Sequence, residues 1–214
     1  MIRLSPELLT FDIFGTVVDW RRGLGEALER YGIPLADADF DSVIDDQAAR
    51  EAGPFRPYAD IVASSLRHVL GLPAEAARAI AAGAGRWPLF PDSRAGLARL
   101  ARFAPCVAMT NSDEAHGRQA QTELGHDMSG WICAEAARCY KPDRAFWRHV
   151  AARRGVGFGP HWWHVSAYAD YDLETARGLG LTTVLVARPH AREGPAGIRV
   201  HDLIDLARRV EAAA

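Results

Sequence analysis

The stretch Phe11-Asp12-Ile13-Phe14-Gly15-Thr16 decides the fold class, because it closes the first apolar run of the chain, residues 8–13. An aspartate at the carboxyl end of a buried strand, followed by a turn of small residues, lies where open α/β sheets bind their ligands. Taken alone, Asp12 and Gly15 could equally form an ordinary turn, since both residue types favour turns for local reasons. The second position after Asp12 is Phe14 rather than a carboxylate, which bears on the chemistry we expect.

Composition and charge exclude several classes of protein. The chain has 214 residues, of which 49% are hydrophobic and 24% charged, and its net charge is −2. These values are ordinary for a globular protein with one core and a smaller accessory domain. The absence of a basic tract argues against a nucleic-acid partner. The sequence has no apolar stretch as long as a membrane span and no export signal, and its three cysteines match no zinc spacing. We therefore expect a cytoplasmic protein that has no membrane partner.

Short apolar runs alternate with helical patterns through the second half of the chain, which predicts a parallel sheet flanked by helices. After the run at 8–13, the predicted strands are Cys106–Thr110, Trp131–Cys133, His164–Ala167 and Thr182–Ala187. The predicted helices between and after them begin near Ser93, at Glu114, at Asp143, at Asp172 and after Asp202. We therefore expect an α/β fold with a Rossmann-like parallel core.

The interval between the first two strands is far longer than the dozen or so residues that a βαβ crossover needs. Its apolar residues repeat at helical spacing and predict four helices: Trp20–Tyr31, Phe40–Glu51, Tyr58–Leu70 and Ala74–Ala84. We infer a helical cap domain, residues 16–90, inserted after the first strand of a core formed by residues 1–15 and 91–214. An insert at that point overhangs the carboxyl edge of the sheet, so it can act as a lid over Asp12.

Four segments are expected to meet at this edge. Asp12 belongs to the first, and the others are Thr110-Asn111-Ser112, Tyr140-Lys141-Pro142-Asp143 and Asp170-Tyr171-Asp172. Each of the last three has an alternative explanation as a helix cap or, for the lysine, as a surface residue before a helix that begins with proline. Their common placement after predicted strands, and their order along the chain, favour a shared site.

These motifs resemble those of the haloacid dehalogenase-like hydrolases, and the resemblance covers nearly the whole chain. It rests on Asp12-x-x-Gly15-Thr16, Thr110-Asn111, Lys141-Pro142 and Asp172. Phe11-Asp12-x-Phe14-Gly15-Thr16 and Tyr140-Lys141-Pro142 look most like the (S)-2-haloacid dehalogenase branch. The resemblance implies a hydrolase that needs no cofactor and no metal. In that branch the residue matching Asp12 attacks carbon of a small 2-substituted carboxylic acid, such as a 2-haloacid, and water hydrolyses the resulting ester.

The resemblance also implies roles for individual residues. Asp12, Thr16, Lys141 and Asp172 would be catalytic, with Lys141 keeping Asp12 ionised and Asp172 pairing with Lys141 and placing or deprotonating the hydrolytic water. The expected substrate-binding residues are Ile13, Phe14, Gly15, Thr110, Asn111, Tyr168, Arg50 and Arg56. Arg50 and Arg56 are the candidates for the halide site, although either could be a solvated charge at a helix end.

The chain departs from this branch in its fourth motif. Where the dehalogenases have Ser-Ser-Asn, it has Ser166-Ala167-Tyr168, with one extra residue before Asp172. Two alternatives therefore stay open beside a 2-haloacid. One keeps the mechanism but releases another leaving group, such as the amine of a strained ring beside a carboxylate. The other is a non-catalytic relative retained for binding.

A magnesium-dependent phosphatase is the rival enzyme class. A carboxylate that approaches a phosphate meets a repulsion of about 4 kcal/mol per pair of charges at 4 Å and an effective dielectric constant of 20, which such enzymes offset with Mg²⁺. Their second aspartate corresponds to Phe14, and Val165-Ser166-Ala167-Tyr168 lacks their metal-binding acid. A displaced metal site on Asp12 and Asp170 stays open.

The segment Pro160-His161-Trp162-Trp163-His164 has two histidines three residues apart but no further ligand at a matching spacing. We therefore expect the tryptophans to cover a sheet edge or a contact between two copies of the chain, which allows a homodimer.

Overall fold

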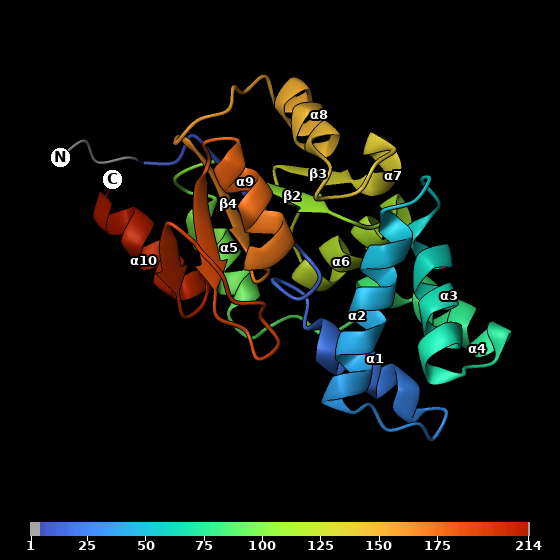
Figure 1. Ribbon diagram of the computed structural model, residues 1–214. Helices are drawn as coiled ribbons and strands as arrows, with labels where there is room; N and C mark the ends of the chain where they lie inside the picture. Colours follow the sequence, from blue (N-terminus) through green and yellow to red (C-terminus); the bar gives the residue numbers. More distant parts are fainter. Residues whose placement is uncertain (1–4, 214) are drawn as a thin grey trace.

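The computed structural model describes residues 5–213 and contains a six-stranded parallel sheet in the order β3-β2-β1-β4-β5-β6 (Figure 1). The strands are β1 (Leu8–Phe11), β2 (Cys106–Thr110), β3 (Gly130–Cys133), β4 (Trp162–Ser166), β5 (Thr182–Val186) and β6 (Ile198–Val200). The chain builds outward from β1 to β3 and then returns to β4 on the other side of β1. This reversal makes the space beyond β1 and β4 the topological switch point, where such sheets bind ligands.

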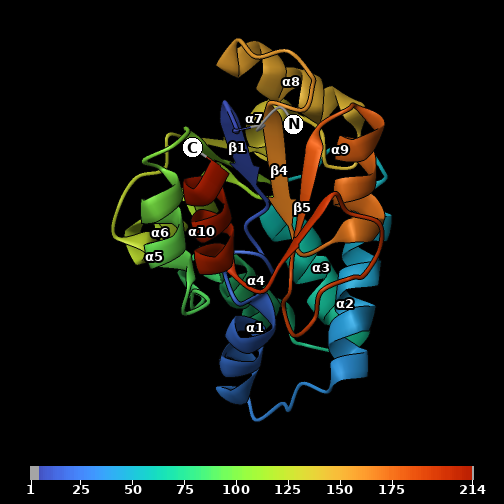
Figure 2. The same cartoon turned by 90° about the vertical axis from the view of Figure 1, so that its left-hand side faces the viewer.

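Helices cover both faces of the sheet. One face carries α5 (Ser93–Leu100), α6 (Glu114–Leu124) and α10 (Leu203–Ala213), and the other carries α8 (Arg144–Arg154) and α9 (Glu174–Gly178) (Figure 2). The short helix α7 (Ala134–Ala137) follows β3. This is the α/β core predicted from the sequence.

Four helices are inserted between β1 and the helix that leads to β2. They are α1 (Trp20–Glu29), α2 (Asp37–Glu51), α3 (Tyr58–Leu70) and α4 (Ala74–Ala82), and they lie together beyond one end of the sheet in both ribbon views (Figures 1 and 2). The predicted helical insertion is therefore present. Asp113, at the start of α6, ties it to the core, because its carboxylate accepts hydrogen bonds from the backbone N–H groups of Tyr58 (2.7 Å) and Ala59 (2.8 Å).

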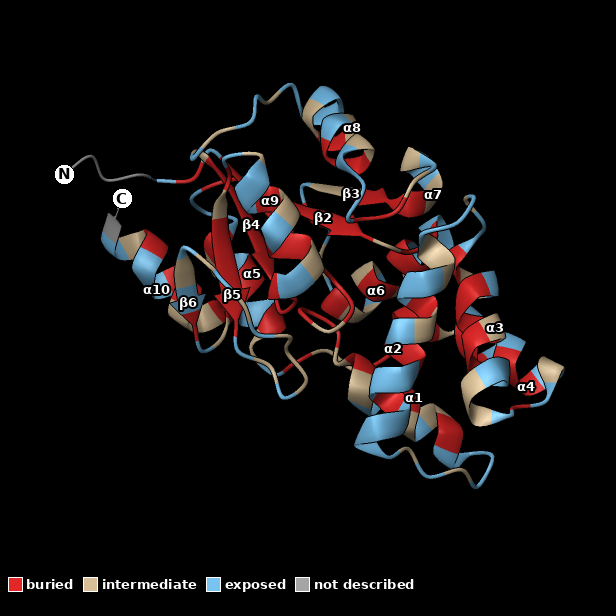
Figure 3. Ribbon diagram, in the orientation of Figure 1, coloured by how far each residue is buried: buried red, intermediate tan, exposed pale blue. Residues whose placement is uncertain are grey.

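Strands β1, β2 and β4, at the centre of the sheet, are buried throughout, as a parallel sheet between two helical layers requires (Figure 3). Trp162 and Trp163 belong to β4, which lies between β1 and β5, and they are only 0% and 6% exposed. The prediction that they cover a sheet edge or a contact between copies is therefore wrong. Two-sided burial explains the run of large apolar residues there.

Several boundaries differ from the predicted ones. The first strand ends at Phe11, two residues before the apolar run does, because the chain turns at Ile13 to accept hydrogen bonds from the N–H groups of Val17 and Val18. Strand β6 and helix α7 were not predicted, since three or four residues carry too little periodicity. None of the helices in the described part of the chain is long and apolar enough to cross a membrane.

Candidate active site

Asp12 lies directly after β1, at the carboxyl edge of the sheet, and is 4% exposed. Its backbone N–H donates to the carbonyl of Val165 on β4 (2.9 Å), which continues the ladder and fixes the position of its Cα. The Thr16 hydroxyl donates to Asp12 Oδ2 (2.8 Å), and it accepts a hydrogen bond from the backbone N–H of Ala167 (2.9 Å). The carboxylate is therefore held from both its own turn and the neighbouring strand.

Lys141 binds two carboxylates at once. Its Nζ lies 3.0 Å from Asp12 Oδ1 and 2.8 Å from Asp172 Oδ2, and its side chain is completely buried. Burial alone would lower the pKa of this ammonium, but Asp12 and Asp172 outweigh it, so the pKa of Lys141 is raised and the side chain is charged. The sequence predicted this contact between Asp12, Lys141 and Asp172, which come from three separate segments.

The two carboxylates have different electrostatic surroundings. Burial raises the pKa of Asp12 above its ordinary value, and Asp172 raises it further, while Lys141 and Thr16 oppose the change. The pKa of Asp172 lies well below its ordinary value, because His164 and Lys141 more than offset its burial. Asp172 therefore holds its negative charge more strongly than Asp12 does.

His164, on β4, is a buried partner of Asp172 that was not among the predicted site residues. Its Nε2 lies 2.9 Å from Asp172 Oδ1, and its Nδ1 lies 2.8 Å from Thr10 Oγ1. Thr10 Oγ1 also accepts a hydrogen bond from Trp162 Nε1 (2.8 Å) and donates one to the carbonyl of Trp163 (3.4 Å). The sequence offered one signal, a polar residue in an apolar strand near the carboxyl edge.

The extra residue before Asp172 is accommodated by a turn of π-helix, Ala169–Leu173, in place of the predicted start of an α-helix. The N–H of Leu173 bonds to the carbonyl of Tyr168, five residues earlier. A π turn absorbs one additional residue in a helix and leaves the direction of the next helical turn unchanged, and such turns are frequent at functional sites. Asp172 consequently still faces Lys141.

Gly15 and Tyr168 are packed against each other. Gly15 has φ +91°, and a Cβ built on it would lie 2.2 Å from the Tyr168 hydroxyl oxygen. Only glycine satisfies both the left-handed backbone and the close approach of the ring. The N–H of Gly15 donates to the carbonyl of Val18, so this amide is not available to a substrate.

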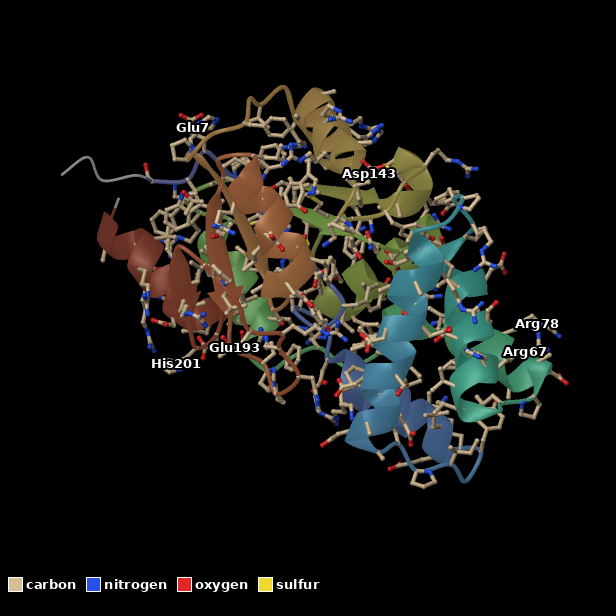
Figure 4. The ribbon with its side chains drawn as sticks, viewed as in Figure 1. Glu7, Arg67, Arg78, Asp143, Glu193 and His201 are labelled. Atoms are coloured by element: carbon tan, nitrogen blue, oxygen red, sulfur yellow. The ribbon has the colours of Figure 1, made fainter. Side chains whose placement is uncertain are left out.

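A cavity of about 620 Å³ opens above Asp12. The sheet edge lines it with Asp12, Phe14, Thr110, Asn111, Lys141 and Tyr168, and the inserted helices line it with Trp20, Ile44, Gln47, Glu51, Phe55 and Tyr58. Asp143, which is labelled in Figure 4 and caps α8, also lies at its wall. Asp172 is not among the lining residues, and Lys141, which it contacts, lies between it and the cavity.

Thr110 and Asn111 differ in whether their side chains are free to bind a ligand. The Thr110 hydroxyl is buried and has no hydrogen-bond partner among the described residues, so it is available to a ligand. Both ends of the Asn111 amide are used: Oδ1 accepts from the backbone N–H of Lys141 (2.8 Å), and Nδ2 donates to the carbonyl of Lys141 (2.9 Å) and to Glu51 Oε2 (2.8 Å). Asn111 therefore positions Lys141 and Glu51.

The two arginines predicted for the halide site do not line the cavity. Arg50 pairs with Asp46, four residues earlier on α2, at 2.5 Å. Arg56 is exposed, and only its backbone carbonyl contacts a site residue, the hydroxyl of Tyr140 (2.6 Å). Two other arginines, Arg138 and Arg192, line the cavity instead, and neither was predicted from the sequence.

Arg192 is paired with Asp45 and Asp170, whereas the guanidinium of Arg138 lies 4.1 Å from the centre of the Phe55 ring and has no carboxylate partner among the described residues. Arg138 has φ +57°, an uncommon conformation for a non-glycine residue that is often found at functional sites. Its position three residues before Lys141 was the signal available in the sequence. Other basic side chains, such as Arg67 and Arg78, extend from the outer side of α3 and α4 (Figure 4).

The residues around Asp12 do not fit the displaced magnesium site considered above. Both oxygens of Asp12 accept hydrogen bonds, from Lys141 and Thr16, and Asp170 pairs with Arg192 at 3.4 Å. Within residues 5–213, no three histidine, cysteine or acidic side chains are grouped so that they could hold a metal ion. The ammonium of Lys141 already supplies a positive charge beside Asp12.

Comparisons with known proteins find similarity in structure but not in sequence. No family model matches the chain, and no curated protein is significantly similar to it. Among solved structures, a defluorinating L-2-haloacid dehalogenase matches 96% of this chain and 95% of its own, with TM-score 0.82 and 24% identity. The L-2-haloacid dehalogenase of Xanthobacter autotrophicus, with chloropropionic acid covalently bound, matches 98% of this chain and 100% of its own, with TM-score 0.83 and 18% identity.

A putative haloacid dehalogenase-like hydrolase of Bacillus subtilis, bound to magnesium, also matches, over 97% of this chain and 99% of its own, with TM-score 0.79 and 14% identity. This architecture is therefore found both in L-2-haloacid dehalogenases and in a hydrolase that binds magnesium. The fold cannot distinguish these two kinds of protein, so the distinction must come from the residues at the site. From the sheet order, the helical insertion and these superpositions, the chain has the haloacid dehalogenase-like fold in the form found in the L-2-haloacid dehalogenases.

Proposed function

We propose that this protein is a metal-independent hydrolase in which Asp12 attacks carbon of a small 2-substituted carboxylic acid, most simply a 2-haloacid, to form an ester that water hydrolyses. The observation that carries the proposal is the single ammonium of Lys141 between Asp12 and Asp172, at 3.0 and 2.8 Å. It supplies in the protein itself the positive charge that keeps a buried carboxylate ionised and nucleophilic. The structural similarity to L-2-haloacid dehalogenases supports the same chemistry.

Substrate binding would use the groups that have no partner of their own. The guanidinium of Arg138 suits the substrate carboxylate, because planar guanidinium groups bind carboxylates through two parallel hydrogen bonds. The Thr110 hydroxyl and the backbone N–H groups of Ile13 and Phe14, which have no acceptor among the described residues, suit an oxyanion beside Asp12. Phe14, Trp20 and Tyr58 give the cavity an apolar wall.

The reaction has two steps. An oxygen of Asp12 forms a bond to C2 of the substrate, and the carbon–halogen bond breaks so that halide leaves with the electron pair. Water then attacks Cγ of Asp12, the bond from Cγ to the ester oxygen breaks, and the 2-hydroxy acid leaves with one proton from that water. The second proton of the water goes to solvent, which restores the Asp12 carboxylate. Lys141 keeps Asp12 oriented through both steps, and Asp172 and His164 keep Lys141 in place.

Halide release tests this proposal directly. The wild-type protein is incubated with 2-chloro-, 2-bromo- and 2-fluoropropionate, and free halide is measured with ion-selective electrodes in the presence and absence of EDTA. We expect release that EDTA does not change and that Asp12→Asn abolishes. Turnover of none of the three acids, or release that depends on an added divalent metal, would contradict the proposal.

The phosphatase alternative is not favoured by any observation at the site, since Phe14 packs against Trp87, Tyr58 and His116 in the position expected for its second aspartate. Its signature would be phosphate release from p-nitrophenyl phosphate that EDTA abolishes.

A further inference from the structure

Glu51 is a second carboxyl group in the cavity above Asp12, and the mechanism above does not use it. It is the last residue of α2, and it lines the cavity together with Ile44 and Gln47 of the same helix. These residues are spaced so that they share one helical face. Arg50 lies off this face and pairs with Asp46.

The contacts of Glu51 distinguish its two oxygens. Oε2 accepts a hydrogen bond from Asn111 Nδ2 (2.8 Å), and Asn111 is itself fixed by two hydrogen bonds to the backbone of Lys141. Oε1 has no partner among the described residues, and no cation there forms an ion pair with Glu51. A carboxylic acid whose carbonyl oxygen is Oε2 and whose proton is on Oε1 satisfies these contacts.

The surroundings of Glu51 favour this neutral form. Burial raises the pKa of Glu51 to about 8, and the nearby Asp12 carboxylate adds to the effect, against the opposing influence of Asn111 and Lys141. The end of a helix also disfavours negative charge, because the helix dipole is negative there. The other ionisable side chains whose pKa values Glu51 affects, those of Tyr58, Tyr140 and Tyr171, are neutral at pH 7.

Direct displacement by Asp12 requires the leaving atom to depart on the side of the carbon opposite the attacking oxygen. Asp12 comes from the sheet edge, whereas Ile44, Gln47 and Glu51 of α2 line the cavity from the side of the insertion. Chloride and bromide leave as very weak bases and need no proton. An acid at the wall is useful only when the leaving atom becomes basic, as an oxygen does.

We propose that Glu51 is a catalytic acid that protonates the leaving atom, and that the site therefore opens strained cyclic ethers that carry a carboxylate beside the reacting carbon. This inference rests on the proposed function and extends it to a second class of substrate. An oxygen of Asp12 forms a bond to the ring carbon next to the carboxylate, and the carbon–oxygen bond of the ring breaks. The ring oxygen keeps the electron pair and takes the proton from Glu51 Oε1. Water hydrolyses the ester at Asp12 Cγ, and Glu51 regains a proton from solvent.

The size of the cavity agrees with a role beyond the smallest haloacids. A cavity of about 620 Å³ is within the usual range of small-molecule sites, so it leaves room beside the reacting carbon for a leaving group larger than a halogen atom.

The test compares two substrates with the same protein. The substrates are oxirane-2-carboxylate, in which oxygen leaves, and 2-bromopropionate, in which bromide leaves. The variants are Glu51→Gln, which keeps an acceptor for Asn111 but has no acidic proton, and Glu75→Gln as the matched control, because Glu75 is exposed on α4 and does not line the cavity. Thermal unfolding of both variants verifies that they fold.

We expect the wild-type protein to convert oxirane-2-carboxylate to 2,3-dihydroxypropionate. Glu51→Gln should lower kcat/KM for this substrate by about 10²- to 10³-fold, the usual contribution of a general acid, and should change bromide release by less than about threefold. Glu75→Gln should change neither. Ring opening by the wild-type protein should also fall as pH rises through about 8, where Glu51 loses its proton, and bromide release should not.

Two outcomes would overturn the inference while leaving the proposed function intact. One is bromide release by a wild-type protein that does not open the ring. The other is a Glu51→Gln variant that loses, or retains, both activities to the same extent. Failure of the wild-type protein with both substrates would overturn the proposed function, and this inference with it.

Discussion

His164 Nε2 lies 2.9 Å from Asp172 Oδ1, the carboxylate oxygen that Lys141 does not bind. Asp172 thus has a partner on each oxygen and stays ionised although it is 0% exposed. The charge on Asp172 in turn keeps Lys141 charged and directed at Asp12. His164, on the central strand β4, is therefore connected to Asp12 through two intermediate side chains, Asp172 and Lys141.

The pair should show a measurable coupling in stability. His164→Phe preserves the ring packing against Trp147, whose centroid is 4.6 Å away, but it leaves Asp172 Oδ1 unpaired. We expect a loss of about 1–3 kcal/mol in the free energy of unfolding, the usual cost of leaving a buried polar group without its partner. In a double-mutant cycle with Asp172→Asn, measured by urea unfolding, the coupling should be at least about 1 kcal/mol. Additive effects would show that the two side chains do not interact.

Asp172→Asn should also move the pH profile of the reaction. In the wild-type protein the pKa of Asp12 is raised above its ordinary value of 3.8, so kcat/KM should fall as pH decreases through a midpoint above 3.8. The negative charge of Asp172 contributes to that increase, and its removal lowers the pKa of Asp12. The acidic limb of kcat/KM for 2-bromopropionate should therefore shift to lower pH, while kcat falls because Lys141 loses one of its two partners. A shift to higher pH would contradict the assigned electrostatics.

Gly15→Ala should destabilise the protein and abolish activity, because the new Cβ would meet the ring of Tyr168 in a backbone conformation that alanine rarely adopts. Gly32→Ala is the matched control: Gly32 also has positive φ, at +69°, but a Cβ there would have no neighbour within 4 Å. We expect about 1 kcal/mol from backbone strain alone at Gly32 and a clearly larger loss at Gly15. Adding Tyr168→Ala to Gly15→Ala should recover part of the stability in thermal unfolding. Equal losses at the two glycines would argue against the close packing.

Arg138→Gln should raise KM for 2-bromopropionate by about 10- to 100-fold and change kcat much less, because a charge-assisted hydrogen bond to the substrate carboxylate contributes about 1.5–3 kcal/mol. Arg56→Gln is the control, since Arg56 is exposed and does not line the cavity. If instead Arg56→Gln raises KM and Arg138→Gln does not, Arg56, one of the two arginines predicted for the halide site, contributes to substrate binding and Arg138 does not.

The sequence was sufficient to predict the parts of the fold that depend on long, regular patterns. The order of apolar runs predicted the parallel core, and the excess length after the first strand predicted four helices in one place. The approach of Lys141 to Asp12 and Asp172 also followed, because the carboxyl ends of neighbouring parallel strands meet at one edge. The exact limits of the two domains stay a prediction.

The missed features depend on side-chain direction or on contacts between distant segments. Arg50 was expected at the site only through the resemblance, whereas helical spacing from Ile44 and Gln47 indicates that Glu51 faces the cavity. The role of His164 requires the register that places it opposite Thr10. The pairing register of two strands that are distant in the sequence cannot be predicted from the residues of either strand alone.

The central claim is that Asp12 forms an ester with carbon, and single-turnover reaction in ¹⁸O-water tests it most directly. An excess of protein is mixed with 2-bromopropionate, and the peptide that contains Asp12 is analysed by mass spectrometry. Because water attacks Cγ of Asp12 and not the substrate carbon, we expect one ¹⁸O atom in the Asp12 carboxylate and none in the hydroxyl group of the product. Label in the hydroxyl group of the product and none in Asp12 would show that water attacks the substrate directly, which would contradict the claim.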